Sequence, residues 1–272
     1  MSDTPRADSA DSADSADSAD SAGTPWAGRA LGPTGFADDA GAADPLLVAA
    51  LQERAARPSA EADATLFRAV RTARWLVPVV AVLGELENTP RDGSGHGLRA
   101  EKSTDMAVVT LTGPDGRRAL PAFTSVQSLH AWEPAARPVP VSADRMAQAT
   151  VAEGCQVVVV DVASDQVTEL RPSMVWALAQ GGEWQPAHLD PFVAQAASRA
   201  VSDEGDVGAH RLEEGEPVGS GILRLVLSLR PGLDATQVEQ VATRVAEQLA
   251  TDGELRARVD ELTFTIEAAP IA

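Results

Sequence analysis

Apolar residues recur first at helical and then at two-residue spacing in the segment that begins at residue 44. Asp44-Pro45 has the pattern of an N-cap followed by a first helical residue, and apolar residues at 46, 47, 50 and 51 share one helical face. A second helix is predicted to start near Ser59. Residues 75–83, rich in β-branched side chains, predict a strand in which Pro78 removes one ladder donor. We therefore expect this strand to lie at a sheet edge or to contain a bulge.

A hairpin is predicted next, followed by alternating short helices and strands. Residues 106–112 read as one strand, Gly113-Pro-Asp-Gly116 is a strong turn signal, and 117–123 return as the second arm. A short helix capped by Thr124 or Ser125 follows, and 138–141 must be extended because each proline disfavours helix in the residue before it. The remaining predictions are a helix over 142–152 closed by Gly154, a central apolar strand over 155–161, a strand over 167–170 and a helix over 172–178.

The C-terminal part has a pattern of its own. After a linker at 184–186, the sequence predicts a helix over 190–201, a strand over 222–229, a helix capped by Asp234 and a half-buried strand over 262–266. This β-α-β unit needs residues 185–215 or a partner subunit to cover its sheet. The fold class is therefore α+β: a mixed β-sheet domain with flanking helices at 44–182, followed by a smaller α/β domain at 183–272.

Composition adds an acidic tail and limits the function classes. In a chain of 272 residues, 22 Lys and Arg against 40 Asp and Glu give a net charge of −18, which argues against a nucleic-acid binder. Residues 8–22 are five Asp-Ser-Ala triplets, so 1–43 is predicted to be a disordered acidic tail. This tail either attracts a basic partner or only aids solubility. The glycine-rich residues 84–102 predict a mobile loop.

No targeting or membrane segment is expected. The N-terminus lacks the basic and apolar regions of a secretory signal, and the longest apolar run, 75–83, is far shorter than the roughly 20 residues of a membrane span. We therefore expect a cytoplasmic protein, in which the single cysteine, Cys155, stays reduced.

The chemistry-bearing residues form no recognisable catalytic or metal pattern. Cys155 precedes a run of valines, where burial raises the pKa of a thiol, so we expect a core residue and not a nucleophile. The four histidines have no metal-ligand spacing, and the glycines at 93–97 lack the strand and helix of a phosphate loop. Neither a metal nor a cofactor is expected.

A binding surface is the more promising prediction. Trp132 precedes a rigid, proline-rich stretch that either lines a peptide-binding groove or acts as a stiff connector. Three cations could hold a small anion such as a carboxylate or phosphate, provided that they lie within about 15 Å of one another, or they could make ordinary surface pairs. The candidate binding residues are Lys102, Arg117, Phe123, Trp132 and Arg137.

Several of these segments, taken in order, resemble a known family. They are 75–82, Lys102-Ser-Thr-Asp-Met-Ala-Val-Val, Gly113-Pro-Asp-Gly-Arg117, Pro121-Ala-Phe-Thr-Ser125 and Ala136-Arg-Pro-Val-Pro-Val141. Together they resemble the N-terminal domain of SseB family proteins in their actinobacterial form, over about 45–180, and 218–268 is similar to the C-terminal region of those proteins. The resemblance implies no catalytic residues.

Three functions remain open at this point. The first is a non-catalytic cytosolic interaction or regulatory protein that binds a protein or a small anionic ligand through the exposed edge around 117–141. The second is an enzyme of unrecognised mechanism in amino-acid or sulfur metabolism. The third is a homo-oligomeric assembly module, in which the strand at 262–266 pairs across a homodimer.

Overall fold

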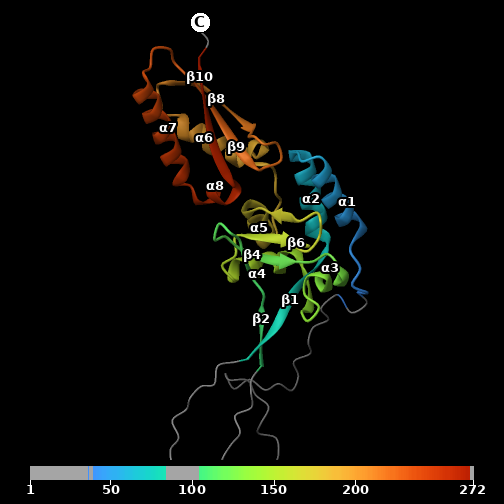
Figure 1. The fold of residues 1–272 in the computed structure, drawn as a ribbon. Helices are drawn as coiled ribbons and strands as arrows, with labels where there is room; N and C mark the ends of the chain where they lie inside the picture. The colour runs from blue at the N-terminus through green and yellow to red at the C-terminus, as the bar shows by residue number, and fades with distance from the viewer. Residues whose placement is uncertain (1–35, 37–38, 84–103, 270–272) are drawn as a thin grey trace, which may run out of the picture. The chain divides into compact units, whose positions relative to one another are not determined.

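The computed structural model describes residues 36, 39–83 and 104–269. Most of the predicted acidic tail and the predicted loop at 84–102 lie outside the described residues. The described fold is α+β, with helices packed on mixed and antiparallel sheets (Figure 1). None of the helices in the described ranges is both long and apolar enough to cross a bilayer.

Helices and strands alternate in a first block that ends with α5. Its elements are α1 (Pro45–Ala56), α2 (Ala60–Thr72), β1 (Arg74–Leu83), β2 (Thr104–Val108), β3 (Leu111–Thr112), β4 (Arg118–Ala122), α3 (Val126–Trp132), β5 (Arg137–Ser142), α4 (Ala143–Ala152), β6 (Val157–Val160), β7 (Thr168–Leu170) and α5 (Pro172–Ala179). The predicted helix starts are confirmed: the Asp44 side chain accepts from the Leu46 amide, and the Ser59 hydroxyl accepts from the Ala62 amide.

The prediction that Pro78 marks an edge strand or a bulge is wrong. β1 is the middle strand of the antiparallel order β2-β1-β5, and no bulge interrupts its pairing with either neighbour. The Pro78 carbonyl accepts from the Val109 amide at 3.3 Å, where proline cannot donate a bond in return. A central strand tolerates this proline because the missing bond falls at the end of β2, so only one ladder bond is lost.

The predicted strand over 106–112 is two strands in different sheets. β2 pairs with β1, whereas β3 pairs with β4 in the order β3-β4-β6-β7. The predicted hairpin is confirmed within this second sheet, because Gly116 has φ +80° in the turn and the Gly113 amide donates to the Arg117 carbonyl. The chain therefore changes sheets at residues 109–110, which an alternating pattern does not reveal.

The valine strand and its flanking elements follow the predictions closely. β6 is an inner strand, parallel to β4 and antiparallel to β7. Gly154, with φ +65°, follows the C-cap of α4 as expected, and Ser125 caps α3 through a capping box with Ser128.

A C-terminal block contains the predicted β-α-β unit and more. Its elements are the 3₁₀ helix η1 (Ala187–Leu189), α6 (Pro191–Val201), β8 (Val207–Glu214), β9 (Ile222–Leu229), α7 (Ala235–Ala250), α8 (Gly253–Arg258) and β10 (Glu261–Ala268). β9 is central, parallel to β10 and antiparallel to β8. The pattern of apolar residues did not predict β8 or α8. β8 in particular is half-exposed and carries few apolar residues.

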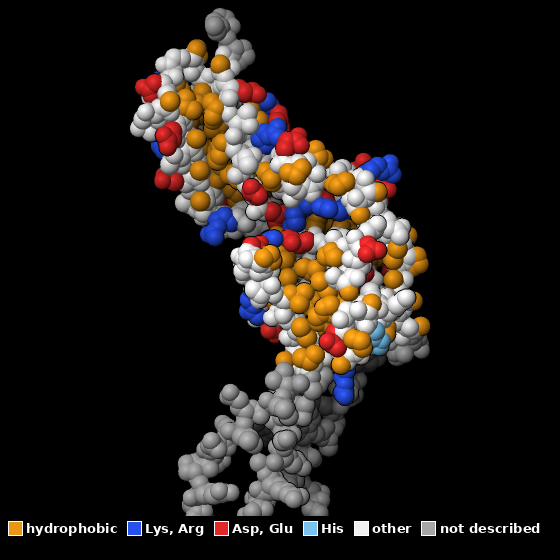
Figure 2. All heavy atoms as spheres, in the orientation of Figure 1, with side chains coloured by type: hydrophobic (Ala, Val, Ile, Leu, Met, Phe, Trp, Pro, Cys, Tyr) orange, Lys and Arg blue, Asp and Glu red, His pale blue; other side chains and the backbone are white. Residues whose placement is uncertain are grey.

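The buried side chains form separate clusters in the two blocks. The largest surrounds Trp75, Phe67 and Leu120 in the first block, and a second surrounds Leu225, Val241 and Val245 in the C-terminal block. On the face shown in Figure 2, hydrophobic side chains also gather over the sheet that contains β4 and β6.

Candidate functional site

Arg117, one of the predicted anion-binding cations, is held by carboxylates. Its Nε donates to Asp115 at 2.6 Å and its Nη1 donates to Glu169 at 3.1 Å, with the arginine side chain 49% exposed. The hydrogen bond that Arg117 donates to Asp115, and after it the charge of Glu169, raises the pKa of Arg117 above its usual value. The same hydrogen bond lowers the pKa of Asp115. Arg117 therefore fixes the hairpin to β7.

The two predicted aromatic residues do meet. Phe123 and Trp132 stack with ring centroids 5.4 Å apart and an interplanar angle of 29°. Phe123 is fully buried beneath α3 with Leu76 and Leu129, and Trp132 is half-buried against this small cluster. The aromatic pair thus anchors α3 to the sheet, and of the two rings only that of Trp132 is partly exposed.

The other two predicted cations are Arg137 and Lys102. Arg137 is exposed at the start of β5, opposite Val79 of β1. Lys102 lies outside the described residues.

Cys155 is a core residue, as predicted. It is 7% exposed and belongs to the first-block cluster. Burial raises the pKa of the thiol above its usual value, and the positive charge of Arg118 offsets this only in part.

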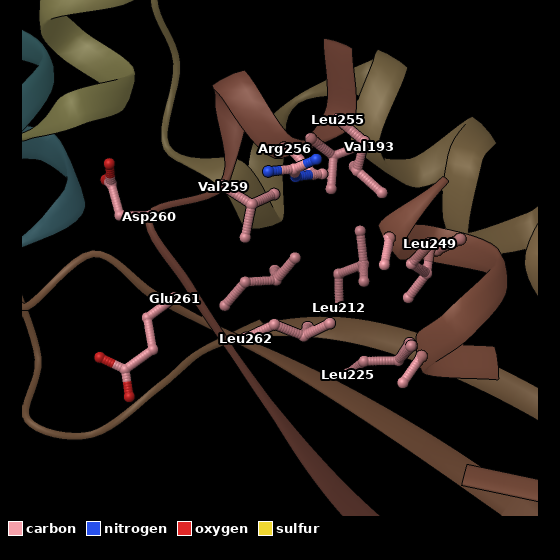
Figure 3. A pocket seen from close by; sticks show the side chains of 14 residues that line it. Val193, Leu212, Leu225, Leu249, Leu255, Arg256, Val259, Asp260, Glu261 and Leu262 are labelled. Carbon is pink, nitrogen blue, oxygen red and sulfur yellow. The ribbon is translucent and has the colours of Figure 1, made fainter. Parts of the chain in front are cut away.

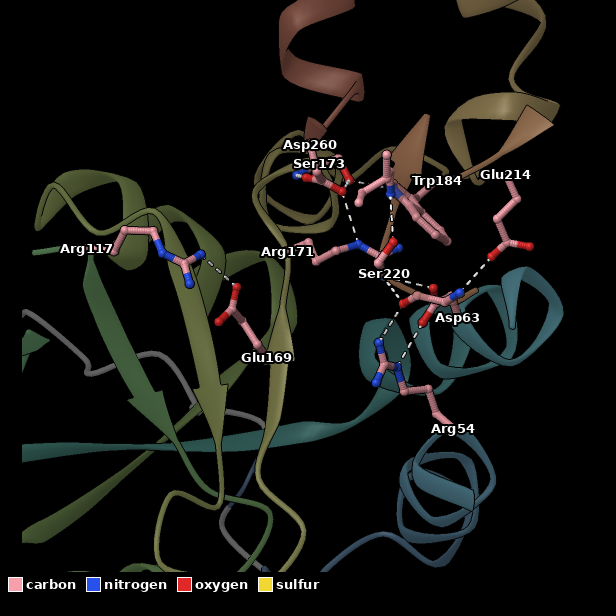
Figure 4. Close-up of polar contacts among 12 residues, drawn as sticks. Arg54, Asp63, Arg117, Glu169, Arg171, Ser173, Trp184, Glu214, Ser220 and Asp260 are labelled. Carbon is pink, nitrogen blue, oxygen red and sulfur yellow. Dashed lines mark hydrogen bonds and ion pairs between the residues drawn. The ribbon is translucent and has the colours of Figure 1, made fainter. Parts of the chain in front are cut away.

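A buried ionic cluster that the sequence did not reveal joins the first block to the C-terminal block. Asp63 of α2 has a side chain only 3% exposed, and its two oxygens accept from Arg54 Nε at 3.1 Å and Arg171 Nη1 at 2.9 Å (Figure 4). Both arginines also donate to the carbonyl of Gly219, at 2.9 and 3.3 Å. One carboxylate of the first block thus holds two cations against the loop before β9.

Asp260 completes the ionic cluster, which from here on means Arg54, Asp63, Arg171 and Asp260. Its Oδ2 accepts from Arg171 Nε at 3.0 Å and from the Ser173 hydroxyl at 2.8 Å, and its Oδ1 accepts from the Ser173 amide at 2.8 Å (Figure 4). Two arginines and two aspartates balance in charge, which is the condition under which buried ions are tolerated.

The loop before β9 fits around Arg171 because it lacks a side chain there. Gly221 has φ +87°, and a Cβ atom at this position would lie 2.5 Å from Arg171 Nε. On its other side the guanidinium lies 5.5 Å from the ring of Trp184, whose indole NH donates to the Ser173 hydroxyl. The predicted linker at 184–186 is therefore packed against this cluster through Trp184.

A cavity of about 360 Å³ opens in the C-terminal block between the sheet and its helices (Figure 3). Its walls are mostly aliphatic and come from α6, α7, α8, β8 and β9, with Leu212, Leu225 and Leu249 pointing inward (Figure 3). Leu225 and Leu249 are buried core residues, so the cavity enters the second core. Its volume and apolar lining are those of a small-molecule pocket.

One wall of the cavity is shared with the ionic cluster. Residues 259–262, which lead from α8 into β10, all line the cavity. Asp260 is among them, and its carboxylate is bound to Arg171 and Ser173 of the first block. Arg256 and Glu261, both exposed, mark where the cavity reaches the surface.

The cavity offers leucine and valine side chains, while the acidic and basic groups of the ionic cluster hold one another. Across the described residues, no group of three His, Cys, Asp or Glu side chains is placed to hold a metal ion.

Comparison with known families identifies the first block. Residues 47–177 match the family model described as the SseB protein N-terminal domain. The chain belongs to the SseB family. The match spans α1 to α5 and so includes Asp63 and Arg171 of the ionic cluster, whereas Asp260 and the cavity follow this SseB domain. No curated protein and no solved structure matches the chain.

The site residues that sequence reasoning missed gave little local signal. Asp63 and Arg171 are 108 positions apart, and each stands among residues that read as ordinary helix or helix start. The Arg171-Pro172 step did indicate a helix start, but a charged residue before a helix gives no sign of a buried partner.

Proposed function

We propose that this SseB family protein is a non-catalytic binding protein, and that the C-terminal cavity holds a small apolar molecule. The observation that carries the proposal is a cavity of about 360 Å³ with mostly aliphatic walls that extends from the surface into the second core. Space of this kind leaves its lining atoms without dispersion partners, so an apolar occupant gains contacts that water does not supply.

The distribution of polar groups supports binding without catalysis. In the described residues no buried side-chain nitrogen or oxygen lacks a hydrogen-bond partner, so the buried polar groups are engaged within the protein. Cys155, the single thiol, is buried in the first-block core.

The test is direct titration of the full-length chain with 1-octanol, a neutral probe with an aliphatic chain, followed by calorimetry and by methyl NMR. We expect saturable binding, with shifts confined to leucine and valine methyls of the cavity. Ala246→Phe, which fills the cavity from α7, should weaken binding at least tenfold. Ala250→Phe enters the cavity from a more exposed position and serves as a second variant if Ala246→Phe unfolds.

Ala242→Phe is the matched control. Ala242 lies one turn before Ala246 on α7, is equally half-exposed and does not line the cavity. The affinity of Ala242→Phe for 1-octanol should stay within about twofold of wild type, because this substitution leaves the cavity volume unfilled. Equal binding by wild type and both cavity variants, or glycerol competing as well as 1-octanol, would refute the proposal.

A second candidate, a homo-oligomeric assembly module, is favoured by the position of β10. This strand forms one edge of the order β10-β9-β8, and its Ile266 is 38% exposed. Pairing of β10 across a two-fold axis would extend the sheet. Light scattering at two protein concentrations should then show a dimer that Ile266→Lys dissociates; a concentration-independent monomer contradicts this candidate.

A further inference from the structure

We infer that occupation of the cavity is coupled to the ionic cluster, so that a bound apolar molecule changes how firmly the C-terminal block is held by the SseB domain. This coupling rests on the ligand site proposed above, and it would make the attachment between the two blocks depend on the ligand. It starts from a single residue, because Asp260 lines the cavity and also binds Arg171.

The segment that carries both roles is short. Residues 259–262 form one wall of the cavity, and within them the Asp260 carboxylate makes three hydrogen bonds, all to residues 171 and 173 of the SseB domain. With residues 259 and 261 on either side of Asp260, a shift of the wall by a fraction of an ångström changes the geometry of these bonds. Hydrogen bonds to a charged group are sensitive to such shifts.

A second attachment lies at Arg258, directly before the wall. Arg258 of α8 donates to Asp190 at 2.9 Å and lies 5.3 Å from the ring of Trp176 in the SseB domain. Leu255 of α8 is a buried residue that lines the cavity. The helix that covers the cavity is therefore attached to α5 at both the Arg258 and the Asp260 positions.

Coupling of this kind must be reciprocal. If the ionic cluster holds the wall in the position that shapes the cavity, then loosening the cluster weakens ligand binding. By the same free energy, a ligand that fixes the wall strengthens the ionic cluster. The amide of Ser173 donates to Asp260 from outside the cavity, so its hydrogen exchange reports the strength of the cluster.

The first arm of the experiment removes the charge at Asp260 in the full-length chain. Asp260→Asn should weaken 1-octanol binding about fivefold or more, within the usual range of coupling energies. Asp206→Asn is the matched control, since Asp206 forms an ion pair with Arg230 and does not line the cavity. Its affinity should stay within about twofold of wild type.

The second arm reads the ionic cluster directly by hydrogen exchange of the Ser173 amide. Saturating 1-octanol should slow this exchange at least threefold in the wild-type protein and have no such effect in Asp260→Asn. Filling the cavity by Ala246→Phe should change the same exchange rate without any ligand, whereas Ala242→Phe should leave it unchanged.

These readouts separate the two proposals. If 1-octanol binds but neither Asp260→Asn nor the Ser173 amide responds, the coupling is wrong and the binding site stands. If 1-octanol does not bind but Ala246→Phe alters the Ser173 amide and Ala242→Phe does not, the coupling stands and the proposed ligand is wrong. No binding together with an unresponsive Ser173 amide overturns both.

Discussion

At the scale of single residues, charged side chains divide into buried structural groups and exposed surface pairs. Asp63 is almost fully buried between two arginines, whereas Asp115 and Arg117 are both about half exposed. An exposed pair contributes little because water screens it, but removal of one partner of a buried pair leaves an uncompensated charge. The same residue type therefore has very different effects at the two positions.

Asp63→Asn should lower the free energy of unfolding by about 3 kcal/mol or more, because Arg54 then loses its carboxylate partner and Arg171 keeps only Asp260. Asp115→Asn, the same change at an exposed pair, should lower it by less than about 1 kcal/mol. Urea denaturation of both variants measures the difference. A loss for Asp63→Asn no greater than that for Asp115→Asn would show that the ionic cluster is not a structural anchor.

The buried thiol of Cys155 makes the stability of the fold depend on pH. This thiol has a pKa raised by burial, so the folded protein keeps this proton to higher pH than the unfolded chain does. At neutral pH the thiol is protonated in both states and does not lower the stability of the fold. Once the pH passes the ordinary thiol pKa, the unfolded chain loses this proton first and the free energy of unfolding declines. At pH 8, reaction with Ellman's reagent should be at least about tenfold slower in buffer than in 6 M urea, because the buried thiol is both less ionised and less accessible. Equal rates would place the thiol at the surface.

At the scale of elements, β5 shows how two prolines protect an edge strand. Leu76 of β1 exchanges both backbone hydrogen bonds with Phe123, so its partner Pro140 in β5 turns its own backbone groups away from β1. Pro138 has the same orientation, two residues earlier. Both prolines thus point toward the open edge, where they remove donors that another strand could use.

Replacing Pro138 and Pro140 together with threonine should preserve the fold and increase self-association, because two free N–H groups then face outward. The average mass from sedimentation should rise with protein concentration in this variant and stay constant in wild type. Pro134→Thr, in the exposed turn before β5, is the control. A monodisperse double variant would mean that the prolines do not protect this edge.

At the scale of the whole molecule, two cores are joined by polar contacts. Four of the five tryptophans lie between residues 75 and 184, so the change in fluorescence on unfolding reports mainly the SseB domain and the adjoining Trp184. Circular dichroism reports both blocks. The ionic cluster makes unfolding of one block unfavourable while the other remains folded, so the two signals should change together in the wild-type protein.

Arg171→Ala should separate the two transitions, because Arg171 contacts Asp63, Asp260 and the carbonyl of Gly219. The midpoints from fluorescence and circular dichroism should then differ by at least about 0.5 M urea, given the usual dependence of stability on denaturant. Arg199→Ala, which removes an exposed pair with Asp252, should leave them coincident. Coincident midpoints in Arg171→Ala would mean that other contacts join the blocks.

Most of the helices and strands, and the resemblance to the SseB family, can be predicted from local sequence patterns. Caps such as Asp44 and Ser125, the turn at 113–116 and the valine strand are decided by residues that are neighbours in the chain, so local rules find them. Tertiary structure alone decided that β1 is central despite Pro78, that residues 106–112 divide between two sheets, and that Asp63, Arg171 and Asp260 meet. The cavity also emerged only in three dimensions, because empty space depends on how helices from distant parts of the chain pack against one sheet.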